Sequence, residues 1–337
     1  MTANFLRKFC STLILLVVTL GLTACGGFLP KTSDNRHNQP LSSTTVAALK
    51  AMGSSPGEAM MIRIFKQEQV LEVWKRTNTG EYRKFKDYQI CTYSGDIGPK
   101  FKEGDRQSPE GIYTITPGLM HPKSNFYLAF NTGFPNKFDR SWGRTGSDLM
   151  VHGDCSSSGC YAMTDGGIAE IYALARESFK GGNPSFQLQA FPFKMTPENL
   201  AKHASSQHLD FWKNIKQGYD LFELNKTPPA WDVCERRYVF NASGGGMLNA
   251  LGPCPPITLQ ASLVSKQKAD DAAFNKLLTA EERKAVETAA IKARGEALGG
   301  AVNSMFTSVG NLFGGGTPAP AMAADGAAPS PMPTIAR

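Results

Sequence analysis

Long apolar runs and clustered basic residues are both scarce in this chain. Its longest apolar run, STLILLVVTLGL at residues 11–22, is too short to span a bilayer comfortably. The formal net charge is +7, but the Lys and Arg residues form no concentrated block and no stripe interleaved with aromatic residues. A nucleic-acid partner is therefore not predicted, and the positive charge is better suited to an anionic envelope surface.

The first 25 residues have the layout of a secretory leader. Arg7 and Lys8 precede the apolar run, which ends in LTAC at residues 22–25. This tetrapeptide resembles a bacterial lipobox, so we expect a signal peptide over 1–24 and a lipid on Cys25. An ordinary leader with an unrelated cysteine is the alternative. Because Gly26 stands where an aspartate would favour the inner membrane, we expect the periplasmic face of the envelope, anchored in the outer membrane.

Export to an oxidising compartment affects how the other cysteines are interpreted. Without Cys10 and Cys25 the number that remains is odd, so at least one thiol should be free. Connectivity does not follow from sequence, although Cys91–Cys234 and Cys234–Cys254 are both reasonable pairs. The remaining cysteines are Cys91, Cys155, Cys160, Cys234 and Cys254.

The chain divides by composition into a tether, one large domain and an extension. Residues 25–57 are polar and predict a flexible tether, with one helical turn near Thr45–Met52. Residues 58–245 contain short alternating strands and a few amphipathic helices, so we predict an α+β domain with a mostly antiparallel sheet. The segment VCERRYVFN at 233–241 is predicted as its last strand.

Helical and low-complexity segments follow that domain. We expect a linker and a helical extension over 246–313, where Thr279 and Glu282 form a capping-box pattern. No catalytic role is predicted for this extension. Residues 314–337 are rich in Ala, Pro and Gly and are predicted to be disordered.

The segment DLMVHGDCSSSGCYAMT at 148–164 has the residue types that cysteine catalysis needs. His152 ends an apolar strand and could act as a general base for Cys160, which lies just before a predicted helix at Thr164. Gly159 would let backbone amides point at a developing oxyanion. Ser157 could support the turn or orient the histidine.

Three other interpretations of the segment remain open. His152, Cys155 and Cys160 could bind zinc, although no Cys-x2-Cys pair and no fourth ligand are evident. Cys155 and Cys160 could instead form a disulfide, or the segment could be a structural loop with a buried thiol. A serine nucleophile is disfavoured because the segment has no Gly-x-Ser-x-Gly elbow.

The sequence resembles the YkuD-type L,D-transpeptidases, and more closely their YafK-like branch. The resemblance rests on GPKFKEGDRQSPEGIYTI (98–115), FNTGFPNKFDR (130–140), GRTGSDLMVHGDCSSSGCYAMT (143–164) and AFPFKMT (190–196), in that order. It implies a β-rich domain that acts at meso-diaminopimelate in peptidoglycan stem peptides. We expect no cofactor and no metal. By position, Cys160 matches the nucleophile, His152 the base, Ser157 the motif serine and Gly159 the turn glycine.

One departure from the family pattern affects substrate binding. Many members have Arg two positions after the nucleophile, where this chain has Ala162. Arg144 or Arg106 could hold a substrate carboxylate instead.

The outcome of the reaction stays open at the sequence level. An amine acceptor, on another stem peptide or on an envelope lipoprotein or outer-membrane protein, would make the protein a transpeptidase. Water would make it an amidase that releases such proteins. A lipoprotein that only binds peptidoglycan is the non-catalytic alternative.

Overall fold

The computed structural model describes residues 34–242, 247–280, 282–288, 290–291 and 295. The predictions for the leader, for Cys25 and for the tail at 314–337 lie outside these residues. Within the described ranges, no helix combines the length and the apolar character needed to cross a membrane.

A single sheet of nine strands organises the domain, in the order β4-β9-β1-β2-β3-β8-β7-β6-β5. Neighbouring strands are antiparallel except for β1 with β9 and β7 with β8. The long strand β3 lies in the middle of the sheet and joins its two parts, since it pairs with β2 on one side and with β8 on the other. The strands are β1 (Met60–Phe65), β2 (Val70–Arg76), β3 (Tyr82–Tyr93), β4 (Gly111–Ile115), β5 (Met120–His121), β6 (Ala129–Asn131), β7 (Met150–His152), β8 (Tyr161–Met163) and β9 (Phe186–Phe191).

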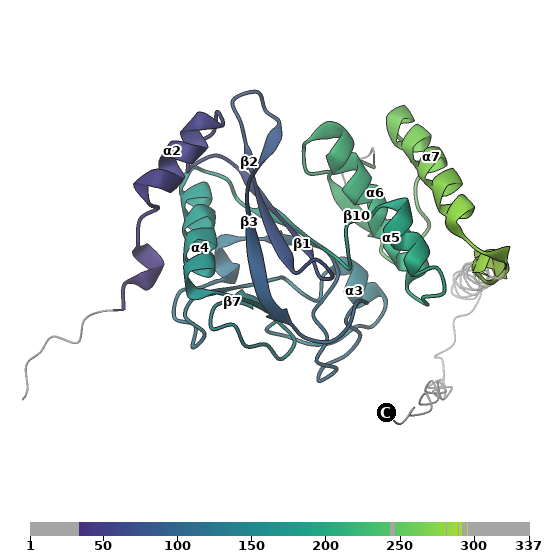
Figure 1. Cartoon of the computed structure of the whole chain (residues 1–337), viewed down its shortest axis with the longest axis horizontal. Coiled ribbons are helices and arrows are strands. Elements are labelled where there is room, and N and C mark those ends of the chain that lie inside the picture. The colour runs from purple at the N-terminus through teal and green to yellow at the C-terminus, as the bar shows by residue number, and fades with distance from the viewer. Residues whose placement is uncertain (1–33, 243–246, 281, 289, 292–294, 296–337) are drawn as a thin grey trace, which may run out of the picture.

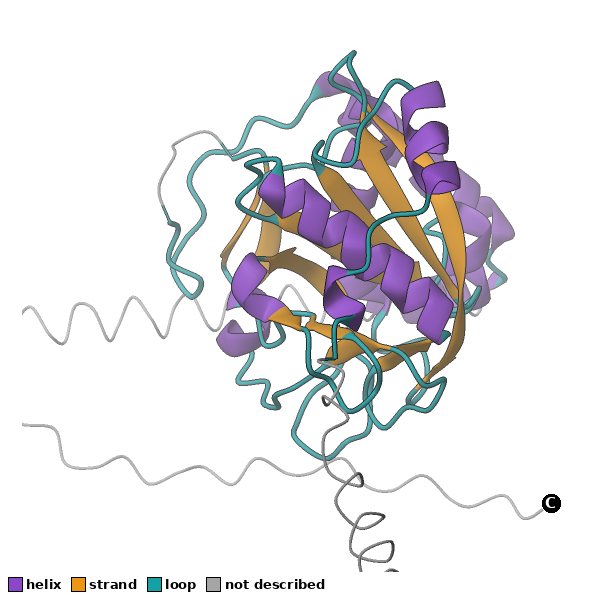
Figure 2. Cartoon of the chain, turned by 90° about the vertical axis from the view of Figure 1, so that its left-hand side faces the viewer, coloured by secondary structure: helices purple, strands orange, loops and turns teal. Residues whose placement is uncertain are grey.

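Helices cover both sides of this sheet (Figures 1 and 2). Helices α2 and α4 lie on one side, and α5, α6 and α7 lie on the other. The helices are α2 (Ser43–Ala51), α3 (Lys137–Ser141), α4 (Asp165–Lys180), α5 (Pro197–Lys202), α6 (Leu209–Asn225) and α7 (Ala261–Leu277), with short 3-10 turns η1 (Arg36–Asn38) and η2 (Pro117–Leu119). The α+β prediction with a mostly antiparallel sheet is confirmed.

Alternation along β1 divides the interior into two cores. Ile62 and Ile64 belong to the core beneath α4, whereas Phe65 belongs to the core beneath α5 and α6. Arg63, which lies between Ile62 and Ile64 in sequence, is also buried and pairs with Glu223 of α6. Strand β1 is therefore buried on both faces, which accounts for its nearly continuous apolar sequence.

The helix predicted after Thr164 is confirmed as α4. The Thr164 hydroxyl accepts a hydrogen bond from the Gly167 amide at 3.1 Å and caps the first turn. Gly181 ends the helix where the chain passes very close to a neighbouring segment, since a Cβ there would lie 2.0 Å from the Gly57 carbonyl oxygen.

The predicted strand over 233–241 is wrong in one respect, because the chain turns back within it. Strands β10 (Trp231–Cys234) and β11 (Arg237–Phe240) form a hairpin. Glu235 and Arg236 between them have φ values of 48° and 56°, the positive values that a tight two-residue hairpin turn requires.

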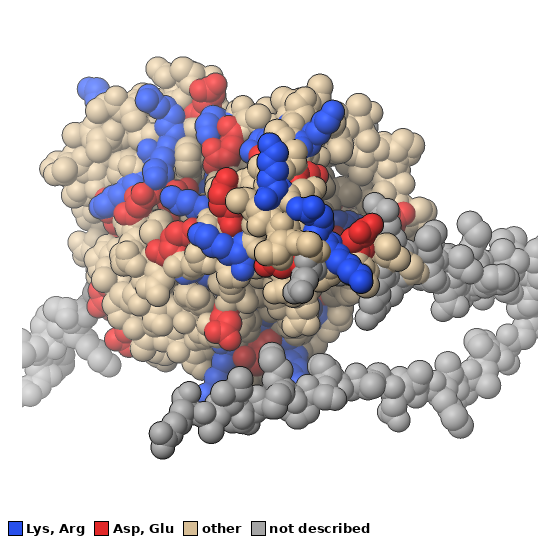
Figure 3. Space-filling model, turned by 45° about the vertical axis from the view of Figure 1, so that its right-hand side comes forward, with Lys and Arg blue, Asp and Glu red and all other residues tan. Residues whose placement is uncertain are grey.

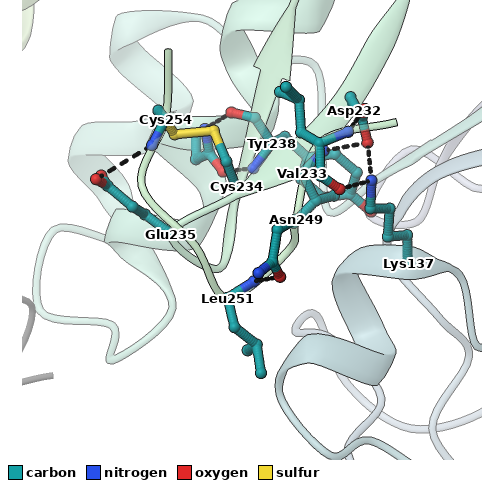
Figure 4. The surroundings of a disulfide bond; sticks show 11 residues. Lys137, Asp232, Val233, Cys234, Glu235, Tyr238, Asn249, Leu251 and Cys254 are labelled. Atoms are coloured by element: carbon teal, nitrogen blue, oxygen red, sulfur yellow. Dashed lines mark hydrogen bonds and ion pairs between the residues drawn. A yellow bond between two sulfur atoms is a disulfide. The ribbon is translucent and has the colours of Figure 1, made fainter. Parts of the chain in front are cut away.

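A disulfide ties the segment after the hairpin back onto it (Figure 4). Cys234 pairs with Cys254, and the Asp232 carboxylate accepts a hydrogen bond from the Leu248 amide at 2.8 Å. The same carboxylate pairs with Lys137 of α3. The expected Cys234–Cys254 bond is present, and the alternative Cys91–Cys234 bond is therefore wrong.

The tether expected over 25–57 is not free along its whole length. Helix α2, close to where a helical turn was predicted, buries Leu49 completely in the core beneath α4. Thr45 donates a hydrogen bond to Glu170 of α4 at 2.6 Å. The described part of this segment thus belongs to the folded body, because one leucine and one buried hydroxyl anchor it.

The C-terminal extension also packs on the domain. Leu263 and Phe274 of α7 are buried in the same core as α5 and α6. Lys216 of α6 lies between Asp220 and Asp270, so an ion-pair network adds to this contact. Thr279 and Glu282 make the reciprocal hydrogen bonds of the predicted capping box.

Charges of both signs are mixed on the face drawn in Figure 3. Lys and Arg side chains lie beside Asp and Glu there, without an extended patch of one sign.

We expect Leu49→Ala to lower the free energy of unfolding by about 2–5 kcal/mol, the usual cost of emptying a buried leucine site. Val46→Ala on the same helix is the matched control, because Val46 is 39% exposed. The control should change stability by no more than about 0.5 kcal/mol. Urea unfolding measures both values, and equal small effects would show that α2 does not stabilise the domain.

Candidate active site

Parallel pairing of β7 with β8 brings the two ends of the HG…SxGC segment together. Val151 is paired with Tyr161 and His152 with Ala162. Cys160 continues this register by one residue, and its Sγ accepts a hydrogen bond from the Met150 amide at 3.3 Å. Since side chains alternate along a strand, His152 and Cys160 lie on the same face of the sheet, one diagonal step apart.

The ring of His152 is held in a single tautomer. Its Nδ1 lies 2.6 Å from the carbonyl oxygen of Gly153. A carbonyl can only accept, so Nδ1 carries the proton and Nε2 of the neutral ring has a free lone pair. The side chain is only 3% exposed, and this burial lowers the pKa of His152, against a smaller opposing effect of the Gly153 hydrogen bond. The imidazole is therefore neutral at pH 7 and can act as a base.

A close approach explains why glycine follows the histidine. A Cβ at Gly153 would lie 2.6 Å from Oδ1 of Asp165 and 3.0 Å from the carbonyl oxygen of Phe126. The Gly153 amide donates to the carbonyl of Phe126, whose ring lies 4.9 Å from the ring of His152. His152 thus lies against Phe126, in the segment before β6, while Gly153 lies against Asp165 at the start of α4.

Cys160 is the one free cysteine among the described residues, and it is partly exposed. Burial raises the pKa of its thiol, while the Met150 hydrogen bond and the Lys100 ammonium lower it to a smaller extent. The thiol is therefore protonated at neutral pH, and a base must remove its proton before it can act as a nucleophile.

The turn before Cys160 is held by the hydroxyl of Ser157. This hydroxyl donates to the carbonyl of Cys160 at 2.7 Å and accepts from the amide of Cys160 at 3.1 Å. Because its only hydrogen goes to that carbonyl, the contact with Ser94 at 2.8 Å must be donated by Ser94. Ser157 therefore supports the turn and has no hydrogen left to orient His152.

The same turn presents unpaired backbone amides. Gly159 has a φ of 115°, which is open mainly to glycine. Within the part of the chain that the structure describes, the amides of Ser158 and Gly159 have no hydrogen-bond acceptor. They are available for a developing oxyanion, whereas the Cys160 amide is occupied by Ser157.

The disulfide pattern removes two alternative interpretations of the segment. Cys155 is bonded to Cys91 of β3, across 64 residues of sequence. Its sulfur is thus unavailable both for a bond to Cys160 and for zinc. The described residues also contain no cluster of three His, Cys, Asp or Glu side chains that could hold a metal ion.

The two arginines considered for substrate binding have different surroundings. Arg144 is 8% exposed, pairs with Asp139 at 2.9 Å and lies against the rings of Phe101, Phe138 and Phe211. Its guanidinium is thus already neutralised by a buried carboxylate. Arg106 is exposed on the loop between β3 and β4 and has a φ of 53°.

The sequence analysis did not identify two serines and a lysine that lie near Cys160. Ser94 and Ser108 join the hydrogen bonds around Cys160, and Lys100 acts on its thiol through its charge. All three belong to or border the loop between β3 and β4. Ser108 opens the SPEG motif at 108–111, which was the only signal that could have identified it.

Comparison with known proteins agrees with this geometry. The family model described as the YkuD L,D-transpeptidase catalytic domain matches residues 58–181, which include both His152 and Cys160. The protein named "Putative L,D-transpeptidase YafK" of Escherichia coli K12 is 42% identical over 198 residues, which are 59% of this chain and 80% of that protein. The chain belongs to the YkuD L,D-transpeptidase family. The YafK protein of Escherichia coli O157:H7 matches with the same identity and coverage.

Solved structures show a weaker likeness to this member of the YkuD family. The cell-shape protein Pgp2 of Campylobacter jejuni aligns with 18% identity and a TM-score of 0.33, over 59% of this chain and 81% of Pgp2. Bd1075 of Bdellovibrio bacteriovorus aligns with 23% identity and a TM-score of 0.29, over 42% of this chain and 51% of Bd1075. These values are too low to support an argument about function.

We expect removal of the Cys91–Cys155 disulfide to change the apparent pKa of the Cys160 thiol, because this bond holds the loop between His152 and Cys160. The double variant Cys91→Ala/Cys155→Ala should lose about 2–4 kcal/mol of stability. The loosened loop should also admit water, so the apparent pKa for alkylation of Cys160 should fall toward the ordinary value of a cysteine.

Cys234→Ala/Cys254→Ala is the matched control, since it removes the disulfide of the β10–β11 hairpin. It should lose stability without moving the alkylation profile. The same pH profile for both double variants would mean that the Cys91–Cys155 bond does not shape the site. Iodoacetamide alkylation followed by mass spectrometry measures the profile.

Proposed function

We propose that this protein carries out cysteine-dependent acyl transfer on peptidoglycan stem peptides, through an acyl-enzyme on Cys160. The observation that carries the proposal is that Cys160, the free thiol among the described residues, lies on the same face of the sheet as His152, a neutral imidazole whose Nδ1 holds the proton. Membership of the L,D-transpeptidase family supports peptidoglycan as the substrate and the carbonyl of meso-diaminopimelate as the point of attack.

The chemistry follows from the protonation states of the two groups. Nε2 of His152 takes the proton of Cys160 as Sγ attacks the carbonyl carbon, and the amides of Ser158 and Gly159 stabilise the oxyanion. When the carbon–nitrogen bond breaks, His152 returns the proton to the leaving amine and a thioester remains. An incoming amine or water then gives its proton to His152 and displaces the thiolate, which recovers that proton.

The identity of the acceptor separates two outcomes of the same acyl-enzyme. We favour an amine acceptor, which makes the protein a transpeptidase, because the family is named for that reaction. Water as acceptor gives an amidase that releases protein bound to diaminopimelate. Export with a lipid on Cys25 is part of this proposal, since it would place the enzyme beside its substrate.

Variants of the two central residues test the proposal directly. The reduced chain from Gly26 onward would be incubated with a tetrapeptide muropeptide and, separately, with peptidoglycan that carries attached lipoprotein. We expect Cys160→Ala to form no acyl-enzyme, and His152→Ala to lower kcat by about 10²–10⁴-fold because the general base is lost.

His203→Ala is the matched control, since His203 stacks on Phe193 in the core beneath α5 and α6, which does not include β7 or β8. Mass spectrometry follows the products. New cross-links indicate the transpeptidase, and release of lipoprotein without cross-links indicates the amidase. If Cys160→Ala formed as much product as the wild-type protein, the proposal would be refuted.

The pH dependence should reflect a neutral thiol and a neutral imidazole. Because burial lowers the pKa of His152, the base stays unprotonated until the pH falls below the ordinary histidine value of about 6.5. The acid limb of kcat/KM should therefore lie below that value. Because burial raises the pKa of Cys160, alkylation should accelerate only above the ordinary cysteine range. An alkylation rate that is already constant between about pH 5 and 7 would instead indicate a preformed thiolate–imidazolium pair.

A further inference from the structure

The SPEG motif at 108–111 lies against the nucleophile, although it contains no group that the reaction uses. Ser108 is completely buried, and its hydroxyl donates to the carbonyl of Cys160 at 2.8 Å. The same hydroxyl accepts a hydrogen bond from the Ser94 amide at 3.1 Å. The Ser108 amide in turn donates to the carbonyl of Ser94 at 3.0 Å.

These contacts close the loop between β3 and β4 at its base. Ser94 and Ser108 hold its two ends together, and both also hold the turn of Cys160. Ser94 reaches the turn through the hydroxyl of Ser157, and Ser108 reaches it through the carbonyl of Cys160. Each of the hydroxyls of Ser94, Ser108 and Ser157 donates its one hydrogen within this cluster, so the donor and the acceptor of every hydrogen bond are fixed.

A buried ion pair fixes Ser108 from the other side. Lys66 and Glu110 lie 3.1 Å apart, and both side chains are completely buried. The Lys66 ammonium donates to the carbonyl of Ser108 at 2.6 Å and to that of Gly98 at 2.9 Å. Glu110 accepts from the Gly98 amide at 2.6 Å. A buried charge pair with all its hydrogen bonds made is rigid, so Ser108 cannot move without breaking it.

We propose that Ser108 is a positioning residue for the nucleophile, which sets the direction of the Cys160 side chain by holding the carbonyl of the same residue. The carbonyl and amide of Cys160 are both restrained, so the Cα–Cβ bond between them points in one direction. That direction places Sγ beside the Met150 amide and on the His152 face of the sheet. This inference rests on the proposed function for its kinetic consequence but not for its geometry.

The test compares Ser108→Ala with Ser108→Thr and with Ser178→Ala. Ser178 is a matched control because it is 1% exposed and lies in α4, away from the Cys160 turn. We expect Ser108→Ala to lower kcat about tenfold with little change in KM, the effect of losing one positioning hydrogen bond. Ser108→Thr keeps the hydroxyl and should recover most of the rate, whereas Ser178→Ala should change stability alone.

Alkylation of Cys160 gives a second measurement that needs no substrate. In Ser108→Ala the released turn should admit water, so the apparent pKa for alkylation should fall toward the ordinary cysteine value while Ser178→Ala leaves it in place. An unchanged alkylation profile in folded Ser108→Ala would overturn the positioning role. If the wild type transfers no acyl group, the proposed function fails, but the alkylation profiles still decide whether Ser108 positions the thiol.

Discussion

The parallel pairing of β7 with β8 is the constraint on which the site depends. Parallel neighbours are normally joined by a connection of about a dozen residues or more, whereas here residues 153–160 make the return. The short connection is possible because both strands are brief, and it passes through positive φ values at Asp154, Cys155 and Gly159. The disulfide from Cys155 to Cys91 and the hydroxyl of Ser157 hold this unusual path at its two ends.

The electrostatics of Cys160 and His152 set a condition on the acyl transfer proposed above. Moving a proton from a thiol of raised pKa to an imidazole of lowered pKa is unfavourable, by about 1.4 kcal/mol for each unit of separation. The free protein therefore holds the two groups neutral, and bond formation to the carbonyl must accompany the transfer. The unpaired amides of Ser158 and Gly159 add to the driving force only when an oxyanion forms. In the proposed mechanism, the reactivity of Cys160 thus depends on bound substrate.

Local patterns predicted the strands, α4 and the catalytic segment, because alternation, caps and the HG…SxGC spacing are encoded within a few residues of each other. Features that depend on distant partners were not predicted. The hairpin at Glu235 was missed because its turn uses positive φ at residues other than glycine. The packing of α2 depends on the burial of Leu49, and the Cys91–Cys155 bond depends on β3 lying beside β8. Ser108 was recognised only as part of a motif, since its contact with Cys160 is tertiary.

The helices beyond the matched family domain also support the turn that carries Cys160. The domain match ends at residue 181, yet Trp212 of α6 donates to Glu110 at 2.8 Å in the buried interior. Without that donor, one buried carboxylate oxygen of Glu110 would lose its hydrogen-bond partner, which costs about 1–3 kcal/mol or more for a charged group. Glu110 and Lys66 in turn hold Ser108, and Ser108 holds Cys160. A continuous series of polar contacts therefore connects α6 to the backbone of Cys160, so the arrangement around Cys160 depends on residues beyond the matched domain.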